Sequence, residues 1–208
     1  PNEKIEILQK RSFFKNTYLI KNCKIPKVCA ERAWISIPGK VKKIYGIPEV
    51  LEKNSVLKDV FIRGNVGDDV KFPVNNVEKC GNIITLSETR EEAIQEGEKI
   101  ISKIVLRLEA NNKATTEFLE QDLQTEFPPS AFNINFDFEN IEKMTQEIEV
   151  SSLRDWNYRT IKDTVELFEK ITNCKISEVQ NSKKFWKYLL RGGIQGALYF
   201  YDSVLKKD

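Results

Sequence analysis

Three glycine-containing loops are the first places where this sequence could bind a charged ligand. A loop that cradles phosphate needs glycines, because successive backbone N–H groups must approach the oxyanion, and it usually precedes a helix. The loop 191–196 contains an arginine and precedes a helix-compatible stretch. It contains neither a P-loop motif nor a dinucleotide-binding motif, and a helix junction with a capping glycine explains it without a ligand. We therefore interpret it as a helix junction, and residues 38–40 and 64–69 as turns.

Pairs of acidic residues are the second kind of candidate, because carboxylates are the ligands that Mg²⁺ prefers. Asp68 and Asp69 are adjacent in a polar turn, where two acids usually face solvent. Glu91 and Glu92 stand in the first turn of an expected helix, where negative charge complements the helix dipole. No dense acidic cluster is visible in the sequence, which therefore predicts no metal site in this chain.

Arg32 is the side chain that we single out as a candidate catalytic residue. It follows Glu31 in the strand-like run CAERAWISI (29–37), directly before the Pro38-Gly39 turn. An arginine at this point could aim its guanidinium at a carboxylate or a phosphate. A surface ion pair on an edge strand explains the same pattern, and the pattern alone favours this second interpretation.

The composition excludes several classes of function. The 208 residues contain no histidine, so this chain alone cannot form a Ser-His-Asp triad, a Cys-His dyad or a histidine-ligated zinc site. A net charge of +2 is too small for a dedicated nucleic-acid or membrane-surface binder, and no apolar run approaches the roughly 20 residues that span a bilayer. The four cysteines are scattered without a CxxC pair, which favours free thiols over disulfides or metal ligation. We expect a cytoplasmic protein that binds neither nucleic acid nor membrane.

The elements that must position these residues change type along the chain. In the first half, short strand-like runs are separated by Gly, Pro and Asn turns, which predicts an antiparallel sheet or a partly open barrel. From Thr89 to Glu109 the apolar residues form a helical stripe, and Thr89 with Glu92 forms a capping box. We therefore expect one long helix that covers the sheet. The expected strands are residues 29–37, 40–47, 56–64, 70–74 and 81–88.

The second half of the sequence is mainly helical. A short helix is compatible with 116–125, and aromatic residues alternate with polar ones in 132–141, which predicts a strand. Thr160 and Ser182 can each cap a helix, the second of which is interrupted by Gly192-Gly193. The aromatic residues of these helices recur at helical spacing, which indicates core packing rather than a stacking surface.

The fold class predicted from these patterns is α+β. Residues 1–110 are expected to form a lobe in which an antiparallel sheet or partly open barrel is covered by one long helix. Residues 111–208 are expected to form a small, mainly helical C-terminal extension.

A series of short motifs occurs in a fixed order within residues 29–104. They are A-E-R-A (30–33), P-G-K-V (38–41), G-D-D-V (67–70), G-N-I-I (81–84) and T-R-E-E-A (89–93). In this order they resemble the C-terminal segment of ATP-grasp ligases, the superfamily of biotin carboxylase, L-amino acid ligases and carbamoyl-phosphate-synthase-like proteins. The resemblance covers a little over a third of the chain, and we identify no family for residues 110–208.

The resemblance implies an ATP-dependent reaction in which a carboxylate is activated as an acyl phosphate, with Mg²⁺, and is attacked by an amine. The family's ATP- and Mg²⁺-binding motifs precede the matched segment, so we expect no cofactor site in this chain and ATP and Mg²⁺ as cofactors of the full-length enzyme. Arg32 resembles a family arginine that in biotin carboxylase stabilises developing negative charge. In the biotin carboxylase pattern one more residue separates the glutamate from the arginine.

Two functions from different classes remain open. The leading hypothesis is the substrate-side or accessory C-terminal portion of an ATP-grasp carboxylate–amine ligase, with the isolated chain inactive. Because the sequence begins with Pro1, we expect a piece of a longer protein whose partner is an upstream ATP-grasp catalytic domain, with a homo-oligomer as a further association. The alternative is a non-catalytic protein-interaction module built from a β-barrel and helices.

Overall fold

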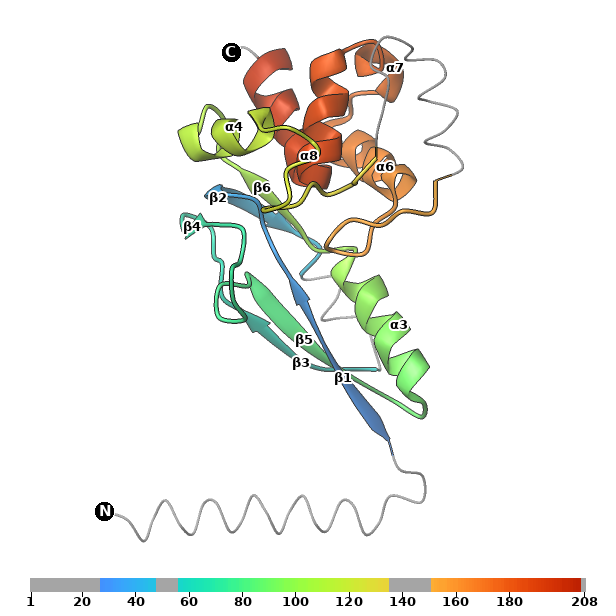
Figure 1. The fold of residues 1–208 in the computed structure, drawn as a ribbon. Coiled ribbons are helices and arrows are strands. Elements are labelled where there is room, and N and C mark those ends of the chain that lie inside the picture. The colour runs from blue at the N-terminus through green and yellow to red at the C-terminus, as the bar shows by residue number, and fades with distance from the viewer. Residues whose placement is uncertain (1–26, 48–55, 135–150, 207–208) are drawn as a thin grey trace, which may run out of the picture.

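The computed structural model describes residues 27–47, 56–134 and 151–206, which form two small antiparallel sheets and a group of helices (Figure 1). The first sheet has the strand order β1-β5-β3, and the second has the order β4-β2-β6. The α+β class is confirmed, while the described strands form two separate sheets and no closed barrel. The strands are β1 (Val28–Trp34), β2 (Gly39–Tyr45), β3 (Leu57–Ile62), β4 (Asp69–Val70), β5 (Gly81–Ser87) and β6 (Val105–Leu108).

Helix α3 (Arg90–Ile101) covers the first sheet, as predicted, and packs against β1 and β5 (Figure 1). Its N-terminus has the expected capping box: Glu92 N–H donates to Thr89 Oγ1 at 3.2 Å, and Thr89 N–H donates to the Glu92 carboxylate at 3.3 Å. The buried Thr85 hydroxyl of β5 lies 2.7 Å from the Ala93 carbonyl oxygen and so joins the sheet to the helix. Local capping and long-range packing therefore agree at this helix.

The predicted extent of this helix was wrong at its C-terminal end. The helix ends at Ile101, and Val105–Leu108 forms strand β6, which pairs with β2. The N–H groups of Lys103 and Ile104 donate to carbonyls three residues earlier and close the helix with a tight turn. The prediction failed because the spacing of Ile104, Val105 and Leu108 also fits a helical stripe. In the structure, residues 105–108 instead form the strand that pairs with the edge of β2.

The remaining helices gather at the opposite end of the molecule from the free end of β1 (Figure 1). Thr160 and Ser182 cap α6 and α8, as predicted. Asn112 caps α4, so this helix begins and ends earlier than the expected 116–125. The elements are α4 (Lys113–Glu120), α6 (Ile161–Thr172), α7 (Ile176–Val179), α8 (Lys183–Phe200) and the π-helical turn η1 (Tyr201–Leu205).

Two further expectations for strands were only partly met. The strand expected at 70–74 is reduced to the two residues of β4, which pair with β2. The strand expected at 132–141 is wrong for 132–134, where Phe132 N–H instead donates to the Leu190 carbonyl of α8. Residues 135–141 lie outside the described residues.

The hydrophobic core joins the sheets to the helices. Buried residues from β1, β2 and β6 belong to the same cluster as buried residues of α8, such as Trp186 and Leu189. The Trp34 ring packs so closely over Gly81 that a Cβ atom there would lie 2.1 Å from the ring. The aromatic residues of α8 are buried, which confirms their expected packing role. The division of the chain at residues 110 and 111 stays a prediction.

Candidate functional site

Arg32 lies on β1, an edge strand of the first sheet, and its side chain contacts α3. The side chain is 25% exposed, and Nε lies 3.6 Å from Glu98 Oε1. Nη1 donates a hydrogen bond to the Glu31 carbonyl at 2.8 Å. Nε itself is buried and has no hydrogen-bond acceptor among the described residues. The guanidinium is thus only partly satisfied by its neighbours.

Glu98 is shared between two arginines. Arg154 Nη1 lies 2.9 Å from Glu98 Oε2, on the other oxygen from the one that faces Arg32. Arg154 also donates from Nε to the Tyr158 carbonyl and stacks over the Tyr158 ring at 5.3 Å. A single carboxylate cannot neutralise two guanidinium groups, so this cluster keeps a net positive charge that suits an anion.

Tyr158 adds a neutral donor to the cluster. Burial raises the pKa of its hydroxyl, and Glu98 raises it further, while Arg32 and Arg154 act in the opposite direction. The phenol therefore remains protonated at neutral pH and can donate a hydrogen bond. This cluster, defined as Arg32, Glu98, Arg154 and Tyr158, can bind and orient an anion, but it contains no obvious nucleophile.

The loop that carries Arg154 and Tyr158 is anchored beneath the cluster by a buried ion pair. Asp155 accepts hydrogen bonds from the N–H groups of Asn157 and Arg159 at 2.8 and 2.9 Å, and its other oxygen lies 3.4 Å from Arg159 Nη1. Arg159 is 1% exposed and donates to the carbonyls of Ser102 and Ile104 at the end of α3. Burial lowers the pKa of Arg159, and the Asp155 carboxylate opposes this effect. The loop is therefore tied to the helix that carries Glu98.

The glycine loop 191–196 lies inside α8 and serves protein contacts. Arg191 is buried and donates to the Phe118 and Pro128 carbonyls at 3.1 and 2.7 Å, and to Gln121 Oε1 at 2.5 Å. Gly193 has the non-helical angles φ 60° and ψ −145°, which interrupt the helix where the sequence predicted a break. These contacts support the interpretation of this loop as a helix junction.

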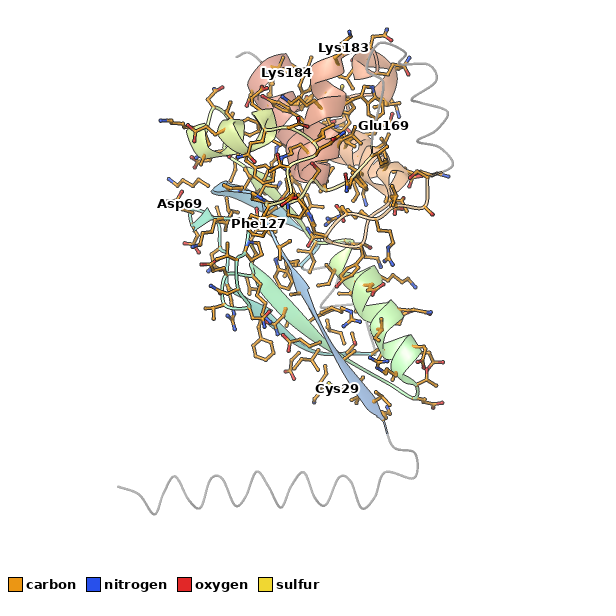
Figure 2. All side chains as sticks on the ribbon, in the orientation of Figure 1. Cys29, Asp69, Phe127, Glu169, Lys183 and Lys184 are labelled. Atoms are coloured by element: carbon orange, nitrogen blue, oxygen red, sulfur yellow. The ribbon has the colours of Figure 1, made fainter. Side chains whose placement is uncertain are left out.

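The acidic pair Asp68-Asp69 is exposed, with Asp68 after a turn and Asp69 at the start of β4. Asp68 Oδ2 accepts from Asn65 N–H at 2.9 Å, and Figure 2 shows Asp69 at the periphery of the molecule. Across the described ranges, no three His, Cys, Asp or Glu side chains are grouped so that they could hold a metal ion. The described residues thus do not fit an Mg²⁺ site, and we assign no chemical step to a metal in them.

The three cysteines that the structure describes do not take part in the cluster. Cys29, Cys80 and Cys174 are free thiols, and Cys29 lies near the outer end of β1 (Figure 2). Burial raises the pKa of the Cys80 thiol to about 12, which leaves it unreactive at neutral pH. Cys23 lies outside the described residues. Among the helices that the structure describes, none is both long and apolar enough to cross a membrane.

Sequence reasoning singled out Arg32 but not the other members of the cluster. One local signal was present: Gly97 stands in the middle of α3, where glycine weakens a helix. A Cβ atom at Gly97 would lie 3.0 Å from Arg32 Cγ, so the glycine makes room for the arginine. Nothing local marked Arg154 or Tyr158, because they reach α3 from a distant part of the chain.

Comparison with known proteins places part of the chain in a family. Residues 33–109 match the family model of the L-amino acid ligase C-terminal domain 2. No curated protein matches the sequence. Phosphoribosylglycinamide synthetase from Anaerococcus prevotii is a similar solved structure, with 23% identity and a TM-score of 0.37 over 41% of this chain and 22% of that chain. L-amino acid ligase from Bacillus licheniformis is another, with 18% identity and a TM-score of 0.35 over 40% and 20%.

The chain therefore spans about a fifth of the length of these two solved structures. The matched range begins directly after Arg32, and it contains the end of β1, strands β2 to β6 and helix α3. The match of residues 33–109 to the C-terminal domain 2 of L-amino acid ligases therefore supports the predicted resemblance of this chain to the C-terminal region of ATP-grasp ligases.

Proposed function

We propose that this chain supplies the substrate-side, accessory part of an ATP-grasp ligase that joins a carboxylate to an amine. The observation that carries the proposal is the match of residues 33–109 to the L-amino acid ligase C-terminal domain. In this proposal the partner is an ATP-grasp catalytic domain of the same cytoplasmic protein. ATP and Mg²⁺ would be bound by residues outside this chain, so the isolated chain would be inactive.

The cluster around Arg32 supports a role in holding an anionic group. A carboxylate and its acyl phosphate are both negatively charged, and Arg32 and Arg154 face only one carboxylate, that of Glu98. The Arg32 side chain is a quarter exposed, so it can reach a ligand while its stem packs against Gly97 of α3. In the proposed enzyme, Arg32 would stabilise negative charge on the reacting group.

Steady-state kinetics of the full-length ligase test the role of Arg32. Removal of a donor that stabilises developing charge typically costs about 100- to 1,000-fold in turnover, so we expect a loss of this order for Arg32→Ala. Arg32→Lys should recover part of it, because the positive charge is kept. Arg90→Ala serves as the matched control, since Arg90 is exposed and lies on the same helix as Glu98. Unchanged turnover in Arg32→Ala, with a normal melting temperature, would remove Arg32 from the reaction.

Calorimetry tests the proposed location of the nucleotide site. Titration of the 208-residue chain with Mg-ATP should produce no binding heat, whereas the full-length ligase should bind. Micromolar binding by the 208-residue chain would contradict the proposal that the nucleotide site lies elsewhere.

A protein-interaction module is the second candidate, and one observation favours it. Phe61 and Ile62 are 47% and 42% exposed on β3, the other edge strand of the first sheet. Exposed apolar residues on a free strand edge are typical of surfaces that pair with another chain. Sedimentation of the chain and of Phe61→Lys tests this: association that is lost in Phe61→Lys favours the module, and a monomer in both cases argues against self-association through this edge.

A further inference from the structure

Strand β3 (Leu57–Ile62) has a free edge in the part of the chain that the structure describes. Its other edge pairs with β5, which separates it from β1 (Figure 1). Helix α3 packs mainly on β1 and β5. A strand edge without a partner presents N–H and C=O groups with which another strand can form hydrogen bonds. A further strand can therefore be added to the first sheet beside β3.

The backbone of β3 indicates which polar groups face this free edge. Directly after the strand, Arg63 N–H donates to the Cys80 carbonyl at 2.9 Å, on the side of β5. Because the direction of these groups alternates along an antiparallel strand, the polar groups of Phe61 face β5 as well. Those of Val60 and Ile62 point to the free edge. These two residues are therefore the ones that can form hydrogen bonds with an added strand.

The side chains along this edge favour association. Phe61 and Ile62 are 47% and 42% exposed. Edge strands commonly avoid pairing through lysine, proline or a bulge, and residues 59–63 contain neither lysine nor proline. The bulge in β3 lies before this stretch, between Leu57 and Asp59. The stretch is thus apolar in its middle and lacks the features that block a second strand.

Two opposite charges flank these apolar residues. Asp59 and Arg63 are both exposed, and Asp59 makes no ion pair with any residue that the structure describes. Arg63 Nη1 donates to the Val77 carbonyl at 3.3 Å, and no described carboxylate pairs with it. Both charges are therefore available to a second molecule.

The sequence of this stretch is complementary to itself. The five residues that begin at Asp59 read Asp-Val-Phe-Ile-Arg. In an antiparallel pair centred on Phe61, opposite charges from Asp59 and Arg63 face each other at both ends. The residues between them, Val60 and Ile62, then form the hydrogen-bonded pairs, as the direction of their polar groups requires. Neighbouring registers with the same hydrogen-bond pattern place an uncharged residue opposite Asp59 and lose both ion pairs.

We propose that two copies of this chain form a dimer through β3, in which one six-stranded antiparallel sheet has the order β1-β5-β3-β3-β5-β1. A two-fold axis perpendicular to the sheet relates the copies, so both α3 helices lie on the same face. The two Phe61 rings lie side by side at this axis, where the side chains of opposite residues approach each other closely. The paired stretch is short, so the dimer dissociates readily. This dimer rests on the protein-interaction candidate, whose partner it identifies, and not on the ligase proposal.

Sedimentation of the 208-residue chain between about 10 µM and about 1 mM tests the dimer. Asp59→Arg and Arg63→Asp each place like charges opposite each other at both ends, and each should weaken dimerisation by about tenfold. An equimolar mixture of the two variants should associate about as strongly as the parent chain, because opposite charges then face each other again. Both positions are exposed, so both variants should fold. A parent chain that stays monomeric, or a mixture that associates no better than either variant, would overturn the proposal.

Lys58→Glu is the matched control, because it changes the net charge as much as Arg63→Asp does, at an exposed position outside the paired stretch. It should dimerise as the parent chain does, and a loss equal to that of Arg63→Asp would contradict the proposed register. Amide hydrogen exchange gives a second measurement: exchange at Val60 and Ile62 should slow as the concentration rises, whereas exchange at Phe61 should not change. Association without this pattern would show that the copies meet elsewhere, which would refute the β3 dimer but leave the protein-interaction candidate standing.

Discussion

The side-chain amide of Asn157 forms two hydrogen bonds with the backbone of Ile35, 122 residues away in the sequence. Ile35 N–H donates to Asn157 Oδ1 at 2.9 Å, and Asn157 Nδ2 donates to the Ile35 carbonyl at 3.0 Å. Ile35 lies between β1 and β2, where no strand pairs with it. The side-chain amide of Gln195 forms similar hydrogen bonds with the next two residues of this segment. Its Oε1 accepts from Ile37 N–H at 3.1 Å, and its Nε2 donates to Ser36 Oγ at 2.8 Å. The helical part of the chain therefore completes the hydrogen bonding of the segment that joins the two sheets.

Replacing Asn157 should destabilise the whole fold. Asn157 is 5% exposed, so Asn157→Ala leaves the N–H and carbonyl of Ile35 without partners in a largely buried place. At about 1–3 kcal/mol for each of the two unsatisfied groups, we expect a loss of about 2–6 kcal/mol in the free energy of unfolding, measured in urea. Asn76→Ala is the control, because Asn76 is exposed, and its effect should stay within about 0.5 kcal/mol. A loss below about 1 kcal/mol for Asn157→Ala would mean that water replaces the amide.

Gly193→Ala should also lower the stability. The residue has φ 60° and ψ −145°, and a Cβ atom would lie 3.0 Å from Asp155 Oδ2. The backbone strain alone costs about 1–3 kcal/mol, and the contact with a buried carboxylate adds to it. Gly67→Ala separates the two effects: φ is +92° there, but the added Cβ would meet nothing within 4 Å. Urea unfolding should therefore show a larger loss for Gly193→Ala, and equal losses would exclude a contribution from the Asp155 contact.

Removing one partner of the Arg107–Asp202 pair should cost more than removing both. The Asp202 side chain is 3% exposed and accepts two hydrogen bonds from Arg107, at 2.7 and 2.5 Å. Arg107→Leu leaves the buried Asp202 carboxylate without its charged partner, and we expect a loss of about 3–5 kcal/mol in the free energy of unfolding. The double variant Arg107→Leu/Asp202→Leu buries no charge and should recover part of this loss.

The control for that pair lies on the surface. Lys113 and Glu117 form an ion pair at 3.7 Å with side chains that are 89% and 64% exposed. Lys113→Ala should change the stability by less than about 0.5 kcal/mol, because water screens such pairs. If the double variant at Arg107 and Asp202 is no more stable than Arg107→Leu, the cost comes from lost packing instead of the stranded charge.

Glu120 should make the stability depend on acid pH. A hydrogen bond from the Tyr188 hydroxyl at 2.6 Å, aided by Lys187 and Lys184, lowers the pKa of Glu120 from 4.5 to about 2. Because the folded state favours the charged form, this contribution is full above about pH 4.5 and is lost as the pH falls toward 2. Urea unfolding should show a stability gap between the parent and Glu120→Gln near pH 6 that narrows near pH 3. A gap that is constant across this range would show that the carboxylate charge is not its source.

Much of the local structure could be predicted because its causes are local. Thr89 and Glu92 are three residues apart, and the capping box that they form depends on that spacing alone. The caps at Thr160 and Ser182 were predicted for the same reason. Strand β6 could not be predicted, because the spacing of its apolar residues fits both a helix and a strand, and only the pairing with β2 decides between them.

The residues of the candidate site were likewise only partly predictable from the sequence. The residue types and the order of the motifs by themselves identified Arg32 and the ATP-grasp resemblance, and the Pro38-Gly39 turn bounded the strand. Only the tertiary structure brought Glu98 and Arg154 beside Arg32, because these contacts join residues far apart in the chain. A cavity of about 460 Å³ between the end of β2, the turn after α3 and α6 depends on tertiary packing even more strongly, since its walls come from three separate segments. Sequence spacing sets hydrogen bonds and charge within a few residues, whereas the distance between remote side chains is set by how the hydrophobic core packs.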